Sequence, residues 1–276
     1  MDNIILVDTS YTSFHRFFAT LRWFSLANKD IYKEHKENTN YDWSKNDIFI
    51  EKYEKMYLES IKKLVKPKVF NKSTIIFCMD SPQEELWRHE YIECYKGNRT
   101  DLTKKANFKP TFDYTYKKII PKLIKEDNIF SIMIKKIEGD DVIAIASKYI
   151  RTKYPNKKVY IVSGDKDFYQ LGYPNLYFAD YKKKELLNFT RKEAKNELLL
   201  KIINGDCSDN IPSIFVEKIS NKMKKELRED KEKLKNYINE NPTVRKQYKI
   251  NKRIISFKYI PKKYQKIALT EIKQIL

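Results

Sequence analysis

Short apolar runs alternate with amphipathic stretches through the first two thirds of the chain. The apolar runs, rich in Ile, Val and Phe, are typical of buried strands and cover residues 4–7, 74–79, 130–134 and 158–162. The stretches with helical spacing of apolar side chains cover residues 10–27, 47–65, 112–126 and 140–153. This alternation predicts an α/β fold with a central, mainly parallel, twisted sheet flanked by helices.

Acidic side chains stand where the predicted strands end. Asp8, Asp80 and Asp165 lie at or just beyond three of these ends, and residues 138–141 (Glu-Gly-Asp-Asp) follow the remaining one. Ligands of parallel sheets bind beyond the carboxyl ends of the strands, so we expect these acids to lie together. Individually, Asp140 or Asp141 could simply cap a helix, and Gly-Asp pairs are common in turns. Their joint placement favours a shared site.

Three acidic clusters, at residues 138–141, 164–167 and 205–209, are the main candidates for chemistry, and a glycine in each permits a tight turn. Together with two strand-end acids they supply Asp8, Asp80, Glu138, Asp140, Asp141, Asp165, Asp167, Asp206 and Asp209. Crowded carboxylates repel one another unless a cation compensates them, and Mg²⁺ prefers oxygen ligands. Two such ions about 4 Å apart would activate water and stabilise the leaving oxygen of a phosphodiester.

The overall charge changes the picture because it suggests a substrate. The 276 residues include 56 Lys and Arg against 37 Asp and Glu, which gives a net charge of +19. Such a surplus attracts polyanions, although a composition generally rich in Lys, Asn, Ile and Tyr explains it equally well.

Cysteine usage and hydropathy indicate the compartment. The three cysteines fit neither a zinc spacing nor a disulfide framework, which favours a reducing environment. The N-terminal apolar run is too short for a signal sequence, and no apolar run approaches the ~20 residues of a membrane helix. We therefore expect a soluble cytoplasmic protein, in the host cell if it is viral, with no membrane partner.

The order of the motifs resembles the flap endonuclease and 5′→3′ exonuclease family, whose nuclease core has a PIN-like fold. The resemblance spans roughly the first three quarters of the chain. It is carried by Asp8, Asp80, Arg88, residues 95–99 (Tyr-Lys-Gly-Asn-Arg), 138–141, 163–167 and 205–212 (Gly-Asp-Cys-Ser-Asp-Asn-Ile-Pro). The short length and the pattern at residues 257–261 are most similar to the ribonuclease H branch of this family in T-even-type phages.

The resemblance implies two Mg²⁺ ions, with Mn²⁺ as a substitute. The first would be held by Asp80, Glu138, Asp140 and Asp141, with Asp8 nearby through water. The second would be held by Asp165, Asp167, Asp206 and Asp209. The resemblance also implies a helical arch at about residues 84–109, in which Lys96 and Arg99 are catalytic contacts to the scissile phosphate and Arg88 is a further phosphate contact.

The arch can also be interpreted from its own residues. In a continuous helix Arg88 and Arg99 would share a face, with Lys96 beside it. Tyr95 near this face would suit single-stranded nucleic acid, because rings stack on bases while cations follow the phosphates. A solvated charged helix is the plainer alternative, and residues 97–98 (Gly-Asn) weaken a continuous helix.

The sequence departs from the commoner family pattern after residues 210–212 (Asn-Ile-Pro). Those members continue with a glycine-rich helix–hairpin–helix that holds duplex phosphates with the help of a monovalent cation. Residues 213–219 contain no glycine, which makes a monovalent-ion site doubtful. Residues 216–276 instead carry 18 Lys and Arg against 7 Asp and Glu. The predicted duplex contacts are Lys218, Lys222, Lys224 and Lys225, for which a solvated helix is nearly as good an interpretation.

We predict a nuclease core over residues 1–190 and a helical duplex-binding region over residues 191–276. The predicted function is that of a monomeric 5′ nuclease in replication or repair, acting as a 5′→3′ exonuclease, flap endonuclease or primer-removing ribonuclease H. Its substrates would be branched or 5′-flap DNA and RNA–DNA hybrid, with a single-strand binding protein or sliding clamp as possible partners.

Two other functions are open. One is a PIN-type ribonuclease, against which the arch-like segment and residues 205–209 argue. The other is a catalytically silent nucleic-acid-binding protein, against which the full set of carboxylates argues.

Overall fold

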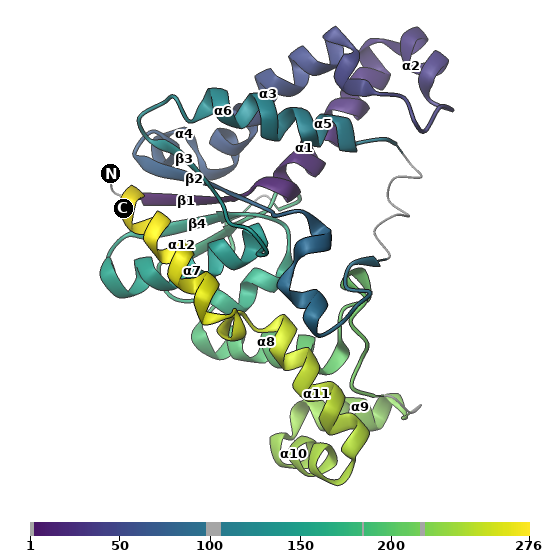
Figure 1. The fold of residues 1–276 in the computed structure, drawn as a ribbon, viewed down its shortest axis with the longest axis vertical. Helices are drawn as coiled ribbons and strands as arrows, with labels where there is room; N and C mark the ends of the chain where they lie inside the picture. The colour runs from purple at the N-terminus through teal and green to yellow at the C-terminus, as the bar shows by residue number, and fades with distance from the viewer. Residues whose placement is uncertain (1–2, 98–105, 184, 216–218) are drawn as a thin grey trace.

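The centre of the fold is a five-stranded sheet whose paired strands all run parallel (Figure 1). The computed structural model describes residues 3–97, 106–183, 185–215 and 219–276. Within them the strand order is β3-β2-β1-β4-β5. The strands are β1 (Asn3–Asp8), β2 (Ser73–Met79), β3 (Ile129–Met133), β4 (Lys158–Val162) and β5 (Leu176–Ala179). The predicted parallel α/β architecture is confirmed.

Separate layers of helices bury the two faces of the sheet. On β1, Ile5 and Val7 belong to one hydrophobic cluster and Ile4 and Leu6 to the other, because successive strand residues point to opposite faces. The first cluster is completed by α1 (Thr9–Ala27) and α3 (Asp47–Val65). The second is completed by α7 (Gly139–Lys153) and α12 (Lys262–Ile275), on the opposite side of the sheet in Figure 1. Coverage of both faces explains why the strands are apolar throughout.

Shorter segments make the connections around this core. The helical ones are α2 (Lys29–His35), α4 (Pro67–Phe70), α5 (Lys109–Tyr114), the π-helical turn η5 (Thr115–Ile119) and α6 (Ile120–Leu123). The 3-10 turns are η1 (Trp43–Lys45), η2 (Gln83–Glu85), η3 (Trp87–Glu90), η6 (Lys166–Leu171), η7 (Cys207–Asp209) and η8 (Phe257–Tyr259).

The C-terminal third is helical and extends away from the sheet (Figure 1). It comprises α8 (Arg191–Asn204), α9 (Asn221–Glu229), α10 (Lys231–Glu240), α11 (Pro242–Ile255) and α12. A small core of its own, containing Ile203, Leu227 and Leu234, joins α8 to α9 and α10. Helix α12 instead returns to the main core through Tyr264 and Ile272. The chain thus re-enters the nuclease core after residue 190, and the proposed division into 1–190 and 191–276 stays a prediction.

Two local features differ from the predictions. The helix expected over residues 112–126 is present over residues 109–123 as the consecutive segments α5, η5 and α6, so it begins and ends earlier than expected and contains a π-helical turn. Strand β5 was not predicted, because only four residues pair with β4 at the sheet edge.

The predicted helical arch is also corrected over the part that the structure describes. Residues 84–97 form two 3-10 turns and further turns rather than a continuous helix. Lys96 has a positive φ of 59°, which interrupts helical geometry next to Gly97. The remaining arch residues up to 105, including Arg99, lie outside the described residues, as does Lys218. The continuous helix that would place Lys96 beside the face of Arg88 is therefore not formed over residues 84–97.

Candidate active site

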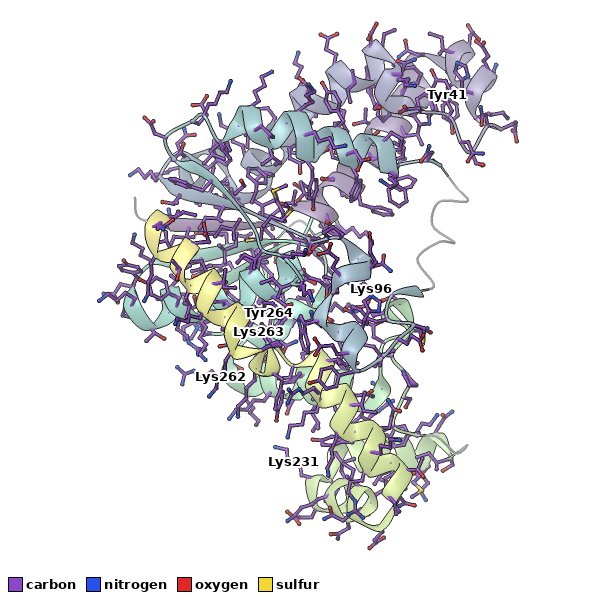
Figure 2. The ribbon with its side chains drawn as sticks, in the orientation of Figure 1. Tyr41, Lys96, Lys231, Lys262, Lys263 and Tyr264 are labelled. Carbon is purple, nitrogen blue, oxygen red and sulfur yellow. The ribbon has the colours of Figure 1, made fainter. Side chains whose placement is uncertain are left out.

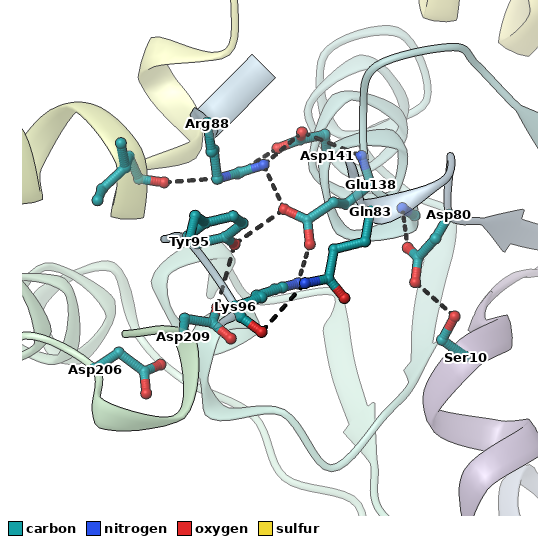
Figure 3. A network of polar contacts seen from close by, with 12 residues as sticks. Ser10, Asp80, Gln83, Arg88, Tyr95, Lys96, Glu138, Asp141, Asp206 and Asp209 are labelled. Atoms are coloured by element: carbon teal, nitrogen blue, oxygen red, sulfur yellow. Dashed lines mark hydrogen bonds and ion pairs between the residues drawn. The ribbon is translucent and has the colours of Figure 1, made fainter. Parts of the chain in front are cut away.

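Asp8 and Asp80 meet at the carboxyl edge of the sheet. Asp8 ends β1, caps α1 by accepting from the Tyr11 amide at 2.9 Å, and accepts from Ser163 Oγ at 2.7 Å. Asp80 follows β2 and accepts from the Gly139 amide at 2.6 Å and from Ser10 Oγ at 2.5 Å (Figure 3). These bonds link the strand ends to the starts of α1 and α7, and so fix both carboxylates at the same edge.

Glu138 is the centre of the polar network in Figure 3. Its carboxylate, 3% exposed, accepts from Arg88 Nη1 at 2.7 Å and from the Tyr95 hydroxyl at 3.0 Å, and pairs with the Lys96 ammonium. The same Tyr95 hydroxyl lies 3.2 Å from Asp209 Oδ2, and the Lys96 amide donates to the Asp209 carbonyl. Tyr95 and Lys96 therefore connect the acids of residues 138–141 with those of residues 206–209.

Asp141 and Arg88 are bound to each other in the buried part of this network. Arg88, 4% exposed, holds both oxygens of Asp141 at 2.6 and 2.8 Å, and Trp87 Nε1 donates to Asp141 Oδ2 at 3.0 Å. Arg88 Nε also donates to the carbonyl of Ile254. Asp141 is fully buried and both its oxygens are engaged, so in this structure it is a partner of Arg88, and its role as a metal ligand stays a prediction. The phosphate contact expected of Arg88 also stays a prediction.

A second acidic group gathers beside the end of α8. Asp165 caps η6 by accepting from the Asp167 amide at 2.8 Å, and Asp206 begins the next acidic turn after Gly205, whose φ of 70° favours glycine. Figure 3 places Asp206 and Asp209 on one loop. The ammonium of Lys201 forms ion pairs with Asp167 and with Asp206, the latter at 2.7 Å. Asp167 and Asp206, which are far apart in the chain, thus share one cation.

The pKa values of Asp8, Asp140 and Glu138 show which carboxylates of the first group are compensated by positive charge. Burial, together with repulsion from Asp80, raises the pKa of Asp8 to about 7. Burial and the nearby Asp8 and Asp165 raise the pKa of Asp140 well above its usual range. Burial also acts to raise the pKa of Glu138, but Lys96 and Arg88 outweigh it and lower the value to about 2. Side-chain cations outweigh burial at Glu138, whereas at Asp140 the charge of Lys96 does not offset burial and the repulsion from Asp8 and Asp165.

The donor set fits hard divalent cations. All nine predicted ligands offer carboxylate oxygen, the kind of ligand that hard divalent cations prefer. Among the residues that the structure describes, no three acidic, His or Cys side chains are already arranged around one point. Their oxygens are instead turned to protein donors such as Ser10, Lys96 and Lys201. Loading an ion therefore requires these side chains to exchange partners.

The remaining predicted contacts lie elsewhere. Lys222, Lys224 and Lys225 are on α9, in the C-terminal extension, and Lys222 and Lys225 are exposed. Figure 2 places Lys96 centrally, between the sheet and the extension that carries Lys231. The lysines of α9 thus form a surface separate from the carboxylates, and their part in duplex binding stays a prediction.

Two residues of the site were missed in the sequence. Asp180 follows β5, is 7% exposed, and accepts from the Tyr11 hydroxyl at 2.9 Å. The strand-end pattern would have found it if β5 had been recognised. Lys201 gave no signal, because its role depends on the end of α8 lying beside two acidic turns.

Comparison with known proteins now identifies the class to which this fold and site belong. Residues 3–198 match the model of the 5′-3′ exonuclease N-terminal resolvase-like domain, so the chain belongs to the 5′-3′ exonuclease family. The resemblance inferred from the motifs is confirmed.

Individual relatives agree with this class. The ribonuclease H of Enterobacteria phage T4 is 28% identical over 227 residues, covering 75% of this chain and 72% of that protein. The T5 5′-exonuclease with bound zinc superimposes with a TM-score of 0.66 at 16% identity, and 99% of each chain is covered. A T5 flap endonuclease in a complex with DNA and metal ions gives a TM-score of 0.65 at 16% identity, covering 99% of this chain and 98% of that one.

No helix within the described ranges has the length and apolar character needed to cross a membrane.

Proposed function

We propose that this protein is a Mg²⁺-dependent, structure-specific 5′ nuclease that hydrolyses phosphodiesters beside a 5′ end. The observation that carries the proposal is the gathering of acids from separate strand ends at one edge of the sheet, where burial and neighbouring carboxylates raise the pKa of Asp8 and of Asp140. Such an arrangement is costly to maintain unless the acids bind cations in the working enzyme.

Two groups of side chains would hold the ions. The first comprises Asp80, Glu138 and Asp140, with Asp8 behind them, and the second comprises Asp165, Asp167, Asp206 and Asp209. Asp141 would have to exchange its partner Arg88, which holds both of its oxygens, before it could join the first group. Divalent cations at these groups supply an activated water and stabilise the departing 3′ oxygen. A monovalent ion is not part of the proposal, since residues 213–219 contain no glycine.

The protein's own residues would position the phosphodiester. In this structure the Lys96 ammonium pairs with Glu138. Once Glu138 binds a divalent cation, that ammonium would contact the scissile phosphate beside it. Arg99 would add a second positive charge to that phosphate. Tyr95 keeps Glu138 and Asp209 in register through one hydroxyl, and its ring lies below the Lys96 ammonium, 5.3 Å from it.

The substrates that fit are branched or 5′-flap DNA and RNA–DNA hybrid. A basic extension at one end would hold duplex through Lys218, Lys222, Lys224 and Lys225, while the acids act on the strand that ends 5′. The T4 relative is named a ribonuclease H and one T5 neighbour a flap endonuclease, so RNA primers and flaps are both proposed. Action as a monomer with a single-strand binding protein or sliding clamp belongs to the same proposal.

The test is cleavage of 5′-labelled substrates, with products mapped by length. The set contains flap DNA, RNA–DNA hybrid and single-stranded RNA, each with Mg²⁺, with Mn²⁺ and with chelator. We expect cleavage of the first two near the branch or the 5′ end, and loss of cleavage in chelator. Preference for single-stranded RNA would instead support a PIN-type ribonuclease.

The decisive variant is Asp167→Asn. It keeps the size of the side chain but removes a charge from the second group, and should reduce cleavage at least about 100-fold while flap binding in chelator changes little. Asp113→Asn is the matched control, because Asp113 pairs with Lys109 on the exposed surface of α5, away from the acidic groups. Full cleavage by Asp167→Asn would overturn the assignment of two ions.

A further inference from the structure

Lys201 lies where the second cation is proposed to bind. It stands in the last turn of α8, four residues before Gly205, and its ammonium contacts the carboxylates of Asp167 and Asp206. The three side chains are only 15–22% exposed, which distinguishes this cluster from an ordinary solvated ion pair such as Lys109–Asp113. One lysine therefore neutralises both sides of the second acidic group.

The surroundings favour a cation at this point. The carboxyl end of a helix carries a partial negative charge, so α8 adds to the attraction of the two acids. Asp206 responds accordingly: burial acts to raise its pKa, but hydrogen bonding and the charge of Lys201 bring it below the usual range. Removal of the lysine would leave two partly buried carboxylates facing each other.

We propose that Lys201 is an internal counter-ion of the second acidic group, which the second divalent cation must displace and which an anionic substrate captures once displaced. This inference rests on the proposed second ion site, because the oxygens that bind the ammonium are the ones assigned to that ion. Two cations cannot share the same oxygens without strong repulsion. Ion binding and Lys201 binding therefore compete.

The competition couples ion and substrate. A released ammonium at the edge of the site lies among positions where a phosphate would bind, and a phosphate that holds it prevents its return to Asp167 and Asp206. Substrate then raises the affinity for the second ion, and by linkage the second ion raises the affinity for substrate by the same factor. Without substrate the second site is closed by the protein's own lysine.

The experiment is a Mn²⁺ titration of the full chain, followed by electron paramagnetic resonance of free Mn²⁺. It is performed with and without flap DNA carrying a non-hydrolysable phosphorothioate-blocked junction. The variant is Lys201→Met, which keeps length and removes charge. The control is Lys195→Met, an exposed residue of the same helix. We expect Lys201→Met to bind the second Mn²⁺ about tenfold more tightly without DNA, and the gain from DNA to shrink.

The direction of the change separates competition from structural damage. Damage to the site would weaken ion binding, whereas loss of a competing cation strengthens it. In chelator we expect a lower melting temperature for Lys201→Met than for the control, and near-recovery on addition of Mn²⁺. Lys201→Arg, which retains the charge, provides a second folded variant and should keep the weak second site.

Unchanged or weaker binding of the second Mn²⁺ in Lys201→Met would overturn the inference and leave the proposed nuclease standing. If the wild type, Lys201→Met and Lys195→Met each bind a single ion, and Asp167→Asn still cleaves, the proposed two-ion function fails instead.

Discussion

Arg88 shows how a single side chain can organise an acidic site without being exposed to substrate. Its guanidinium holds Asp141 by two bonds and Glu138 by a third. The Cζ atom of the guanidinium lies 4.6 Å from the centre of the Trp87 ring. An arginine suits this place better than a lysine because its fixed fork satisfies both carboxylates at once. At the residue scale, the site is therefore a balance between buried acids and the cations that compensate them.

That balance predicts the effect of removing Arg88. Arg88→Met leaves Asp141 and part of Glu138 buried without their partner, and should lower the free energy of unfolding by about 3–5 kcal/mol. Urea denaturation measures it. Arg151→Met is the control, since Arg151 on α7 lies over the Tyr173 ring at 5.4 Å and its loss should cost about 1 kcal/mol or less. Equal losses would contradict the role given to Arg88.

His15 provides a pH-dependent prediction outside the acidic groups. Its ring stacks on Tyr181 with centroids 4.2 Å apart, and burial, followed by the charge of Arg16, lowers its pKa. The unfolded chain then binds a proton that the folded chain resists, so this contribution to stability is present above the unfolded pKa of about 6.5 and is lost as pH falls below it. In chelator, the difference between the urea midpoints of the wild type and His15→Gln should be smaller at pH 5.5 than at pH 8. An equal difference at the two pH values would refute this.

At the scale of elements, α7 starts where the backbone of β2 ends. Glu138 and Asp141 form a capping box at this start, so two acids expected to bind metal also define the first turn of a helix. Gly139 between them was expected to permit a turn, but its φ is not positive. Its need is for space: a Cβ there would lie 2.6 Å from the Cys78 carbonyl oxygen.

Gly139→Ala should therefore move the start of α7 away from β2. We expect a loss of about 1–3 kcal/mol in stability, as for other overpacked positions, and a fall in cleavage because the amide of Gly139 also holds Asp80. The comparison is Gly97→Ala, whose added Cβ would meet its nearest atom, Cys94 Cβ, at 3.8 Å. Melting temperatures of the two variants check it, and a Gly139→Ala protein as stable as the Gly97→Ala protein would refute the packing argument.

At the scale of the whole molecule, opposite charges are separated in space. The acids gather at one edge of the sheet, while α9 and its neighbours carry lysines on an extension (Figure 1). This separation suits a polyanion that is held by charge at one end and cut at the other. It also explains how a chain with a net charge of +19 can contain a strongly acidic site.

The lysines of the extension predict that the affinity for duplex DNA falls as the salt concentration rises. Replacing Lys222, Lys224 and Lys225 by Gln should weaken duplex binding at every sequence and reduce the slope of log affinity against log salt by up to about 2–3. The control removes the same charge from α12, at Lys262, Lys263 and Lys266. Figure 2 shows Lys262 and Lys263 away from the extension. Anisotropy titrations over a salt series give both slopes. Equal slopes for the two triple variants would remove the lysines of α9 from the interface.

How much the sequence determined differs between the fold and the site. Four strands and the long helices α1, α3 and α7 follow from periodicity, because burial on one face repeats at fixed intervals. The strand-end acids follow as well, since parallel strands bring their carboxyl ends to one edge. Strand β5 does not follow, because four residues at a sheet edge carry too little pattern.

The pairing of each charged side chain was decided only by tertiary structure. Chain order placed Arg88 and Asp141 in the right region, but only the folded structure shows that they pair with each other. Lys201 is part of the site because α8 ends beside two acidic turns. The turn with Asp167 lies far before α8 in the chain, and the turn with Asp206 follows α8 after Gly205. Local pattern fixes which face of an element is buried, whereas charge compensation depends on distances between elements, and these exist only in the folded molecule.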